Sequence, residues 1–416
     1  MRESIDYLIE RSSLGSPLVK QIAQRTPVEV ADRIIFRATG SGRSDISVAS
    51  EGNLLIPAYR GSSKPTTSKE ASMGFTARFL DEILRPIQAE QAILNEARDR
   101  RASVLAIALK FVGALRVFNS GSLAHGTVIK PVSDADCGVV LDRRSYPELG
   151  PDGGEVGPDS IVEEVRDFIG AELRETYKNA RLTITKRAIK VTFDEPLNDE
   201  EDPSVDIVVG LTRASAEGLW IPNTEKDEWD PSHPEKHTEL LTGGSKALRR
   251  IRARAIRLSK AWNKQYSKPA VCSFNLEALA LTAIENDTSL PEALHAFFDE
   301  GATQLAKGLT PDPAGVSDPI KVPDLPVAIR RFEAAEQALN EALKRDDDED
   351  AVREALSVVF HKYISPPKGA SKSAWADAVR KMEQGTIRIG ATGLTLGSDT
   401  GGRVMKPVRS FGDDGR

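Results

Sequence analysis

Cysteine and long apolar runs are both scarce in this 416-residue chain. Two cysteines, Cys137 and Cys272, are too few for a disulfide-stabilised scaffold or a cysteine-rich zinc site. The longest apolar stretch, residues 102–118, is broken by Lys110 and Arg116 and is shorter than the ~20 residues that span a bilayer. The first residues alternate charged and apolar side chains, which is not the pattern of a signal peptide. We therefore expect a cytoplasmic protein with reduced thiols and no membrane partner.

An excess of positive charge is also absent. The chain has 56 Lys and Arg residues against 62 Asp and Glu residues, which gives a net charge of −6. Domains that act on nucleic-acid backbones are usually basic, so this balance argues against such a role. It does not argue against a small anionic ligand, because that needs only a local cluster of positive side chains. The length corresponds to two or three domains at about 150 residues per domain.

The chain divides into segments of different character. Apolar residues recur at steps of three and four from residue 75 to 113, which predicts one long helix with a possible kink at Pro86. Strands are predicted at 116–120, 137–142, 181–186, 187–193 and 204–211, with a helix at 162–177. Beyond residue 240 only helices are predicted, at 244–265, 273–286, 290–300, 327–345, 348–363 and 371–384.

We therefore expect an α+β protein with a mixed sheet followed by a helical lobe. The expected divisions are an N-terminal helical and linker extension (1–74), an α+β core that begins with the long helix (75–245), a helical lobe (246–365), and a C-terminal helix with a glycine-rich tail (366–416).

The most informative segment runs from residue 121 to 141. Gly121-Ser122 follows a predicted strand, and Asp134 and Asp136 stand at the head of the next one. Alternate residues of a strand share a face, so the two carboxylates project together. A third carboxylate, Asp206, lies inside the apolar strand 204–211.

Three carboxylates near one another indicate a divalent-cation site. Buried carboxylates are costly unless they are paired or bound to metal, and oxygen ligands favour Mg²⁺ or Mn²⁺. Gly121 permits close approach of the backbone to a phosphate, and Ser122 offers a hydroxyl and an N–H group. Each part alone has a simpler explanation: an Asp-x-Asp pair is usually a solvated strand end, and Asp206 could pair with Lys190. The combination points to a nucleoside triphosphate held by metal and a Gly-Ser turn.

This pattern resembles the cGAS/DncV-like nucleotidyltransferases, bacterial relatives of animal cyclic GMP-AMP synthase and oligoadenylate synthase. The matching residues are Gly121, Ser122, Gly126, Thr127, Pro131, Asp134, Asp136 and Asp206. The resemblance implies a polymerase-β-like core with a helical lobe, and two Mg²⁺ or Mn²⁺ ions held by Asp134, Asp136 and Asp206. It further implies that Lys260 and Ser273 contact the triphosphate and that Phe274 stacks on a base. Residues 316–323 are similar to an Asp-Pro loop of the family.

The helix predicted around Lys260 has a basic face of its own. Its apolar stripe contains Ile251, Ala255, Leu258 and Trp262, and the roughly opposite face carries Arg250, Arg254, Arg257, Lys260 and Lys264. A solvated surface is the commoner explanation for such arginines. A triphosphate nevertheless requires nearby cations, which fits the role implied for Lys260.

The resemblance implies an enzyme that joins ATP, GTP or pyrimidine nucleoside triphosphates into a cyclic di- or trinucleotide. Such a product would be a second messenger in anti-phage (CBASS-type) signalling, with a regulatory or accessory defence protein as a possible partner. Two alternatives stay open: transfer of a nucleotide to an RNA end, small molecule or protein, and a catalytically idle nucleotide-binding scaffold. The zinc-binding His/Cys cluster of the animal enzyme has no counterpart, so activation by double-stranded DNA is not expected.

The remaining candidates are assigned structural roles. We expect residues 220–237 to lie over the nucleotide pocket or to join the two lobes, with His233 and His237 at the surface. His125 is interpreted as packed or solvent-facing rather than as a general base. Cys137 and Cys272 are interpreted as small core residues.

Overall fold

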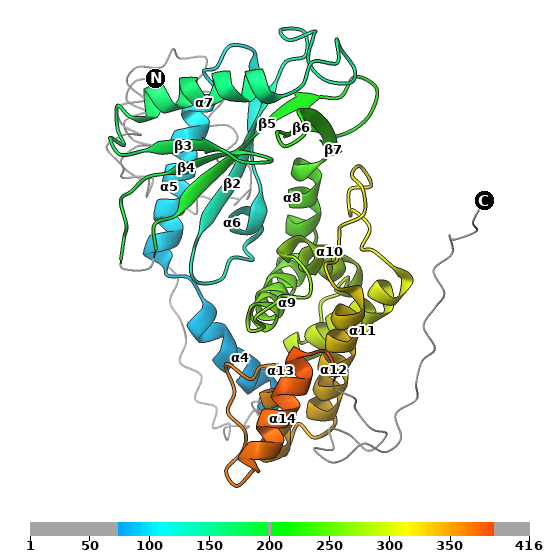
Figure 1. Ribbon diagram of the computed structural model, residues 1–416. Coiled ribbons are helices and arrows are strands. Elements are labelled where there is room, and N and C mark those ends of the chain that lie inside the picture. The colour runs from blue at the N-terminus through cyan, green and yellow to red at the C-terminus, as the bar shows by residue number, and fades with distance from the viewer. Residues whose placement is uncertain (1–73, 199–200, 387–416) are drawn as a thin grey trace, which may run out of the picture. The chain divides into compact units, whose positions relative to one another are not determined.

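The computed structural model describes residues 74–198 and 201–386 (Figure 1). Residues 1–73 of the predicted extension (1–74) and residues 387–416 of the predicted C-terminal division (366–416) lie outside the described residues. None of the helices in the described part is long and apolar enough to cross a membrane.

The described part contains a seven-stranded mixed sheet and two groups of helices. The strands are β1 (Ala114–Asn119), β2 (Asp134–Leu141), β3 (Arg181–Ile184), β4 (Ile189–Thr192), β5 (Ser204–Thr212), β6 (Leu219–Asn223) and β7 (Glu228–Ser232). The helices are α4 (Phe75–Ile87), α5 (Gln91–Ala108), α6 (Gly121–His125), α7 (Asp159–Leu173), α8 (Pro234–Thr242), α9 (Lys246–Lys264), α10 (Ser273–Ala283), α11 (Leu290–Lys307), α12 (Leu325–Lys344), α13 (Glu349–Val359) and α14 (Lys372–Glu383).

The sheet places β2 and β5 side by side at its centre. Its order is β1-β2-β5-β4-β3, and β6 and β7 continue from β5 as a hairpin. The β2–β5 pair is parallel, whereas the other pairs are antiparallel. Both central strands are rich in buried apolar residues, as expected where a sheet is covered by helices. Helix α5 packs against β2 and β5, and α7 packs against α5 and β3.

Two large hydrophobic clusters form most of the interior, and a third, small one contains Phe118, Val140 and Leu219. One large cluster contains α5, α7 and the sheet. The other contains α9 to α14 together with α4. At its centre Trp262 meets the rings of Tyr266, Phe298 and Phe332, with ring centroids 4.9 to 5.6 Å apart. Helix α4 therefore packs with the helical lobe, although it precedes the sheet in the sequence.

The single helix predicted for 75–113 is wrong, because two helices occupy this range. Helix α4 ends at Ile87, and Gln88 has an extended backbone with ψ of 126°. Pro86 lies in the last turn of α4, and proline cannot donate the backbone hydrogen bond that continues a helix. The carbonyl of Ile87 instead accepts a hydrogen bond from the N–H of Lys130 at 2.9 Å, just before the loop that leads to Asp134.

Strands β6 and β7 were not predicted. They contain Pro222 and Pro231, and proline is rare inside central strands because it lacks the N–H donor. The hairpin tolerates them because it is attached to the rest of the sheet only through β6. Helix α8 follows directly and contacts both β1 and α10.

Candidate active site

The three carboxylates come together at one end of the central strands. Ala135 is fully buried in the sheet core, so Asp134 and Asp136 on either side of it point to the opposite face. In the parallel pairing of β2 with β5, Asp136 stands beside Asp206. Lys190 on β4 stands opposite Asp206 from the other side.

Gly121 is required by its backbone and by its neighbour. Its φ is +68°, a conformation that L-residues rarely adopt, and a Cβ atom added there would lie 1.7 Å from Oδ2 of Asp136. The N–H of Ser120 donates to the carbonyl of Asp136 at 3.1 Å, which holds the turn against β2. The Gly-Ser turn is thereby fixed directly over the Asp136 carboxylate.

Crowding of the carboxylates changes their proton affinity. Burial, and then the charges of Asp134 and Asp206, raise the pKa of Asp136 to about 6. Burial also raises the pKa of Asp206, with Lys190 acting in the opposite direction and Asp134 adding to the rise. Oδ1 of Asp206 is buried without a hydrogen-bond partner among the described residues. The cluster therefore holds more negative charge than its protein neighbours balance.

These features fit a divalent cation. An unpaired buried carboxylate oxygen and a raised carboxylate pKa are what a bound cation would relieve. Within the described ranges no three His, Cys, Asp or Glu side chains form a ready-made metal cage. Mg²⁺ does not need one, because it usually takes several ligands from water and substrate phosphates.

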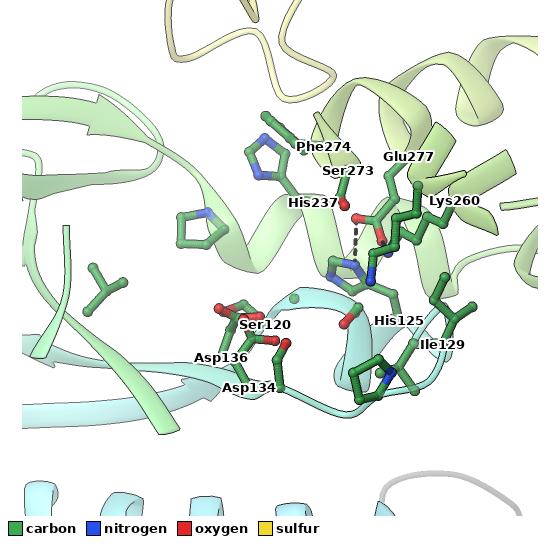
Figure 2. A pocket seen from close by; sticks show the side chains of 18 of the residues that line it. Ser120, His125, Ile129, Asp134, Asp136, His237, Lys260, Ser273, Phe274 and Glu277 are labelled. Carbon is green, nitrogen blue, oxygen red and sulfur yellow. Dashed lines mark hydrogen bonds and ion pairs between the residues drawn. The ribbon is translucent and has the colours of Figure 1, made fainter. Parts of the chain in front are cut away.

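A cleft of about 550 Å³ extends from these carboxylates to the helical lobe. Figure 2 shows Asp134 and Asp136 on one side and Lys260, Ser273 and Glu277 on the other. Every predicted site residue except Asp206 lines the cleft: Gly121, Ser122, Asp134, Asp136, Lys260, Ser273 and Phe274. The volume lies in the range of pockets for small organic ligands.

Lys260 lies at this cleft in a buried ion pair. Its Nζ donates to Glu277 Oε1 at 2.8 Å and to the Thr127 hydroxyl at 3.1 Å, and the side chains of Lys260 and Glu277 are 5% and 7% exposed. Burial opposes ionisation of Glu277, but hydrogen bonding to His125 and the charge of Lys260 outweigh it and lower the pKa of Glu277 to about 2. The expected basic face thus carries a carboxylate counter-ion at this position. Lys264, one turn further along α9, lines the cleft without an ion-pair partner in the described part.

His125 is packed, in line with one of the two expectations for it. Its Nδ1 lies 3.1 Å from Glu277 Oε2, and its Nε2 lies 3.1 Å from the Thr238 hydroxyl (Figure 2). The ring therefore joins the helix after the Gly-Ser turn to α10 and α8. This arrangement favours a positioning role.

The surface assignment of His237 is wrong. Its Nε2 lies 2.6 Å from Oδ1 of Asp312, and its ring centroid is 4.8 Å from that of Phe274. Backbone N–H groups of residues 314, 316 and 317 also donate to Asp312. Phe274 is thus held at the cleft by a histidine that a buried aspartate orients. His233 does not share this burial, and its Nδ1 accepts a hydrogen bond from the N–H of Lys236 at the start of α8.

The two cysteines differ. Cys137 is fully buried in the sheet core, as expected. The prediction for Cys272 is wrong, because it is exposed at the start of α10, where its thiol contacts Oδ1 of Asn275 at 3.0 Å. Cys272 and the following Ser273 both lie at the exposed start of α10, outside the apolar interior.

Glu277, Thr238 and Asp312 escaped prediction from the sequence, and Thr127 was named only as a residue that matches the family. A signal existed for Glu277, since it is the sole charged residue in the otherwise apolar helix α10. A carboxylate at such a position needs a partner. Asp312 carried no comparable signal, because its partners come from α8 and from its own loop.

Residues 77–243 match the family model of the Second Messenger Oligonucleotide or Dinucleotide Synthetase (SMODS) domain. A comparison with curated protein sequences gives no match. Among solved structures, E. coli MS115-1 CdnC with ATP is 18% identical, with 70% of this chain and 98% of that chain covered and a TM-score of 0.50. Vibrio cholerae DncV in its apo form is 13% identical, with 70% and 96% covered and a TM-score of 0.50.

These likenesses confirm the expected α+β, polymerase-β-like fold with a helical lobe. The SMODS match covers the sheet, the Gly-Ser turn and all three carboxylates. By this match residues 77–243 are similar to the domain of nucleotide second-messenger synthetases, in line with the resemblance to the cGAS/DncV-like nucleotidyltransferases.

Proposed function

We propose that this protein joins nucleoside triphosphates into a cyclic di- or trinucleotide by attack of a ribose hydroxyl on an α-phosphate. The observation that carries the proposal is the meeting of Asp134, Asp136 and Asp206 on neighbouring strands beneath the Gly-Ser turn. The SMODS match over residues 77–243 supports the same reaction class.

Asp134, Asp136 and Asp206 are the residues that would hold two Mg²⁺ or Mn²⁺ ions. Such ions, when bound, lower the pKa of the attacking hydroxyl and offset the charge of the reacting phosphate. The Oδ1 atom of Asp206, which lacks a hydrogen-bond partner in the described part, would then have a cation as its partner.

The other cleft residues would bind and orient the donor nucleotide. Gly121 and Ser122 place backbone and hydroxyl donors over the carboxylates, where the phosphates must lie. Ser273 and Lys264 reach the same cleft from the helical lobe. Lys260 would act together with Glu277, so the pair is nearly neutral and Lys264 supplies uncompensated positive charge. Phe274, held by His237, would stack on a base.

In the proposed reaction a new ester bond forms between the acceptor oxygen and the α-phosphorus. The bond to the departing pyrophosphate breaks in line with it. A second such step between the two ends of the linear product closes the ring. The product is proposed to act as a second messenger in anti-phage signalling, with a separate effector and a regulatory protein as partners.

Mass spectrometry of the products tests this proposal. The purified chain is incubated with all four nucleoside triphosphates and either Mg²⁺ or Mn²⁺, beside the Asp134→Asn/Asp136→Asn double variant. The matched control is Asp167→Asn/Asp377→Asn, which makes the same chemical change at one exposed and one partly exposed position away from the cleft. We expect a cyclic oligonucleotide from the unmodified chain and the control, and at least 100-fold less from the double variant.

A linear product would keep the transfer chemistry but contradict the ring closure. Product formation by the double variant at the unmodified rate would contradict the assignment of the two carboxylates. Absence of any product with either metal would favour transfer to an RNA end, a small molecule or a protein.

A further inference from the structure

A second cavity, of about 390 Å³, lies between α4 and α9 and shares no lining residue with the candidate active site. It is lined by Asp81, Leu84 and Arg85 of α4, by Gln88 just after α4, and by Arg250, Arg254 and Arg257 of α9. Four arginines face one aspartate and one apolar residue, so the lining is strongly positive.

The positive charges of this cavity are only partly compensated. Arg254 forms an ion pair with Asp81. Arg257 donates through Nε to the carbonyl of Ala253 at 3.3 Å, and its guanidinium has no acidic partner among the described residues. Burial, and then the charge of Arg254, lower the pKa of the partly buried Arg257. A partly buried cation without a counter-ion favours the binding of an anion.

Another arginine of the same helix shows how a structural guanidinium is satisfied in this lobe. Arg252 is 6% exposed and donates to the carbonyls of Ile284, at 2.8 and 3.2 Å, and of Leu240, at 3.4 Å. Arg250 has no comparable hydrogen bond or ion pair to the part of the chain that the structure describes. Among the described residues, the exposed Arg250 and the partly buried Arg257 therefore have no acidic partner, whereas Arg254 is paired with Asp81.

The lining selects a class of ligand. Guanidinium groups bind phosphate through two parallel hydrogen bonds. Arg250, Arg254 and Arg257 occupy successive turns along about 10 Å of helix, which suits a short chain of linked phosphates. The cavity has no aromatic side chain on which a base could stack.

We infer that the cavity between α4 and α9 is a binding site for a short polyphosphate, either free or carried by a nucleotide, that is separate from the active site. The inference does not depend on the proposed reaction, because it concerns different residues and is tested by binding alone.

Binding of inorganic tripolyphosphate to the full chain, measured by isothermal titration calorimetry in EDTA, tests the inference. The Arg250→Gln/Arg257→Gln variant removes two cavity arginines. The Lys246→Gln/Arg249→Gln variant is the matched control, since it removes the same charge from exposed positions of α9 outside the cavity.

The Lys264→Gln variant instead removes a positive charge from the active-site cleft. We expect the affinity of the cavity for tripolyphosphate to fall at least tenfold in the Arg250→Gln/Arg257→Gln variant. In the other two variants this affinity should stay within twofold of that of the unmodified chain. Thermal melting checks folding, and Arg85→Gln/Arg250→Gln replaces the first variant if it does not fold.

Parallel titrations with pyrophosphate, ATP and a single-stranded RNA distinguish the sources of the phosphate. Comparable binding of ATP and tripolyphosphate supports recognition of the phosphate chain of a nucleotide, and binding of the free polyphosphates alone supports a free one. Equal losses in cavity variant and control, no binding at all, or loss only with Lys264→Gln would overturn the inference. RNA binding at least tenfold tighter than tripolyphosphate, abolished by the cavity variant, would overturn it in favour of a nucleic-acid surface.

Discussion

Gly121 and Asp136 constrain each other at the scale of single residues. The positive φ of the glycine brings the backbone over the carboxylate, and the carboxylate occupies the space that any side chain at position 121 would need. The raised pKa of Asp136, about 6, arises from burial and from the two neighbouring carboxylates. The turn and the acidic cluster therefore form one unit, in which a change to either part displaces the other.

Substitution of Gly121 by alanine tests this dependence. The added Cβ would collide with Asp136 and displace its carboxylate, so we expect nucleotide incorporation to fall at least 100-fold. The loss of stability should be only about 1–2 kcal/mol, the cost of an alanine at positive φ. Incorporation is measured with radiolabelled nucleotide, and stability by urea denaturation.

Gly369→Ala is the matched control for this substitution. Gly369 also has positive φ, +91°, but no atom lies within 4 Å of its added Cβ. The control should lose similar stability and keep its activity. Equal activity of the two variants would contradict the role given to the contact between Gly121 and Asp136.

At the scale of elements, helices α6, α9 and α10 meet through a buried polar network. Glu277 accepts hydrogen bonds from Lys260 and from the Thr127 hydroxyl, at 2.8 and 2.5 Å, and contacts His125. Lys260 comes from α9, whereas His125 and Thr127 lie at and just after the end of α6, so the network joins the Gly-Ser turn to the helical lobe. Removing Glu277 leaves the buried Lys260 ammonium without its counter-ion.

The Glu277→Gln substitution should destabilise the protein by about 2–4 kcal/mol at pH 7, because it leaves the Lys260 ammonium unpaired. The pKa of Glu277 is lowered to about 2 in the folded state, so its stabilising effect is present above about pH 4.5 and is lost as the pH falls towards 2. We expect the free energy of unfolding to decrease over that window, and less steeply in the variant. Urea denaturation at a series of pH values measures both effects.

Glu336→Gln is the control for this series, since Glu336 is also paired to a histidine, His295, but on more exposed side chains. Equal pH dependence of Glu277→Gln and the unmodified protein would refute the assignment of this titration to Glu277.

The sequence predicted the helices and strands in which apolar residues recur at regular spacing. It missed the features that depend on contacts with segments far away in the sequence. The strand 204–211 and the helices after residue 240 follow from apolar spacing and β-branched content. The sequence predicted a kink at Pro86 but not the end of the helix at Ile87, because the apolar spacing continues on both sides of this point. The two helices nevertheless belong to different hydrophobic clusters. Strands β6 and β7 were missed because Pro222 and Pro231 disfavour a strand locally.

The candidate site shows the same division. The three aspartates and the Gly-Ser turn are close in sequence or lie in recognisable strands, so they could be proposed from the residues alone. The partners of Lys260 and His237 could not, because Glu277 and Asp312 reach them from elements that only the tertiary fold brings near. The assignment of His237 to the surface failed for this reason.

On the scale of the whole described molecule, two hydrophobic clusters support the two sides of one cleft. The sheet cluster holds the strands that carry the carboxylates, and the helical cluster holds the helices that carry Lys260, Ser273 and Phe274. Helices α4 and α5 belong to one cluster each and are joined by residues 88–90. Each half of the cleft therefore has a rigid base, as precise orientation of a nucleotide requires.

The central claim is that the protein, through its three carboxylates, joins nucleoside triphosphates to one another and needs no polymer as acceptor. Its most direct test is the release of pyrophosphate from nucleoside triphosphates alone, with Mg²⁺ or Mn²⁺, by the unmodified chain and by Asp206→Asn. This substitution keeps the shape of the side chain and removes the negative charge of the carboxylate. The Oδ1 atom of that carboxylate lacks a hydrogen-bond partner in the described structure. We predict release by the unmodified chain and a reduction of at least 100-fold in the variant. No release by the unmodified chain, or equal release by both, would contradict the account.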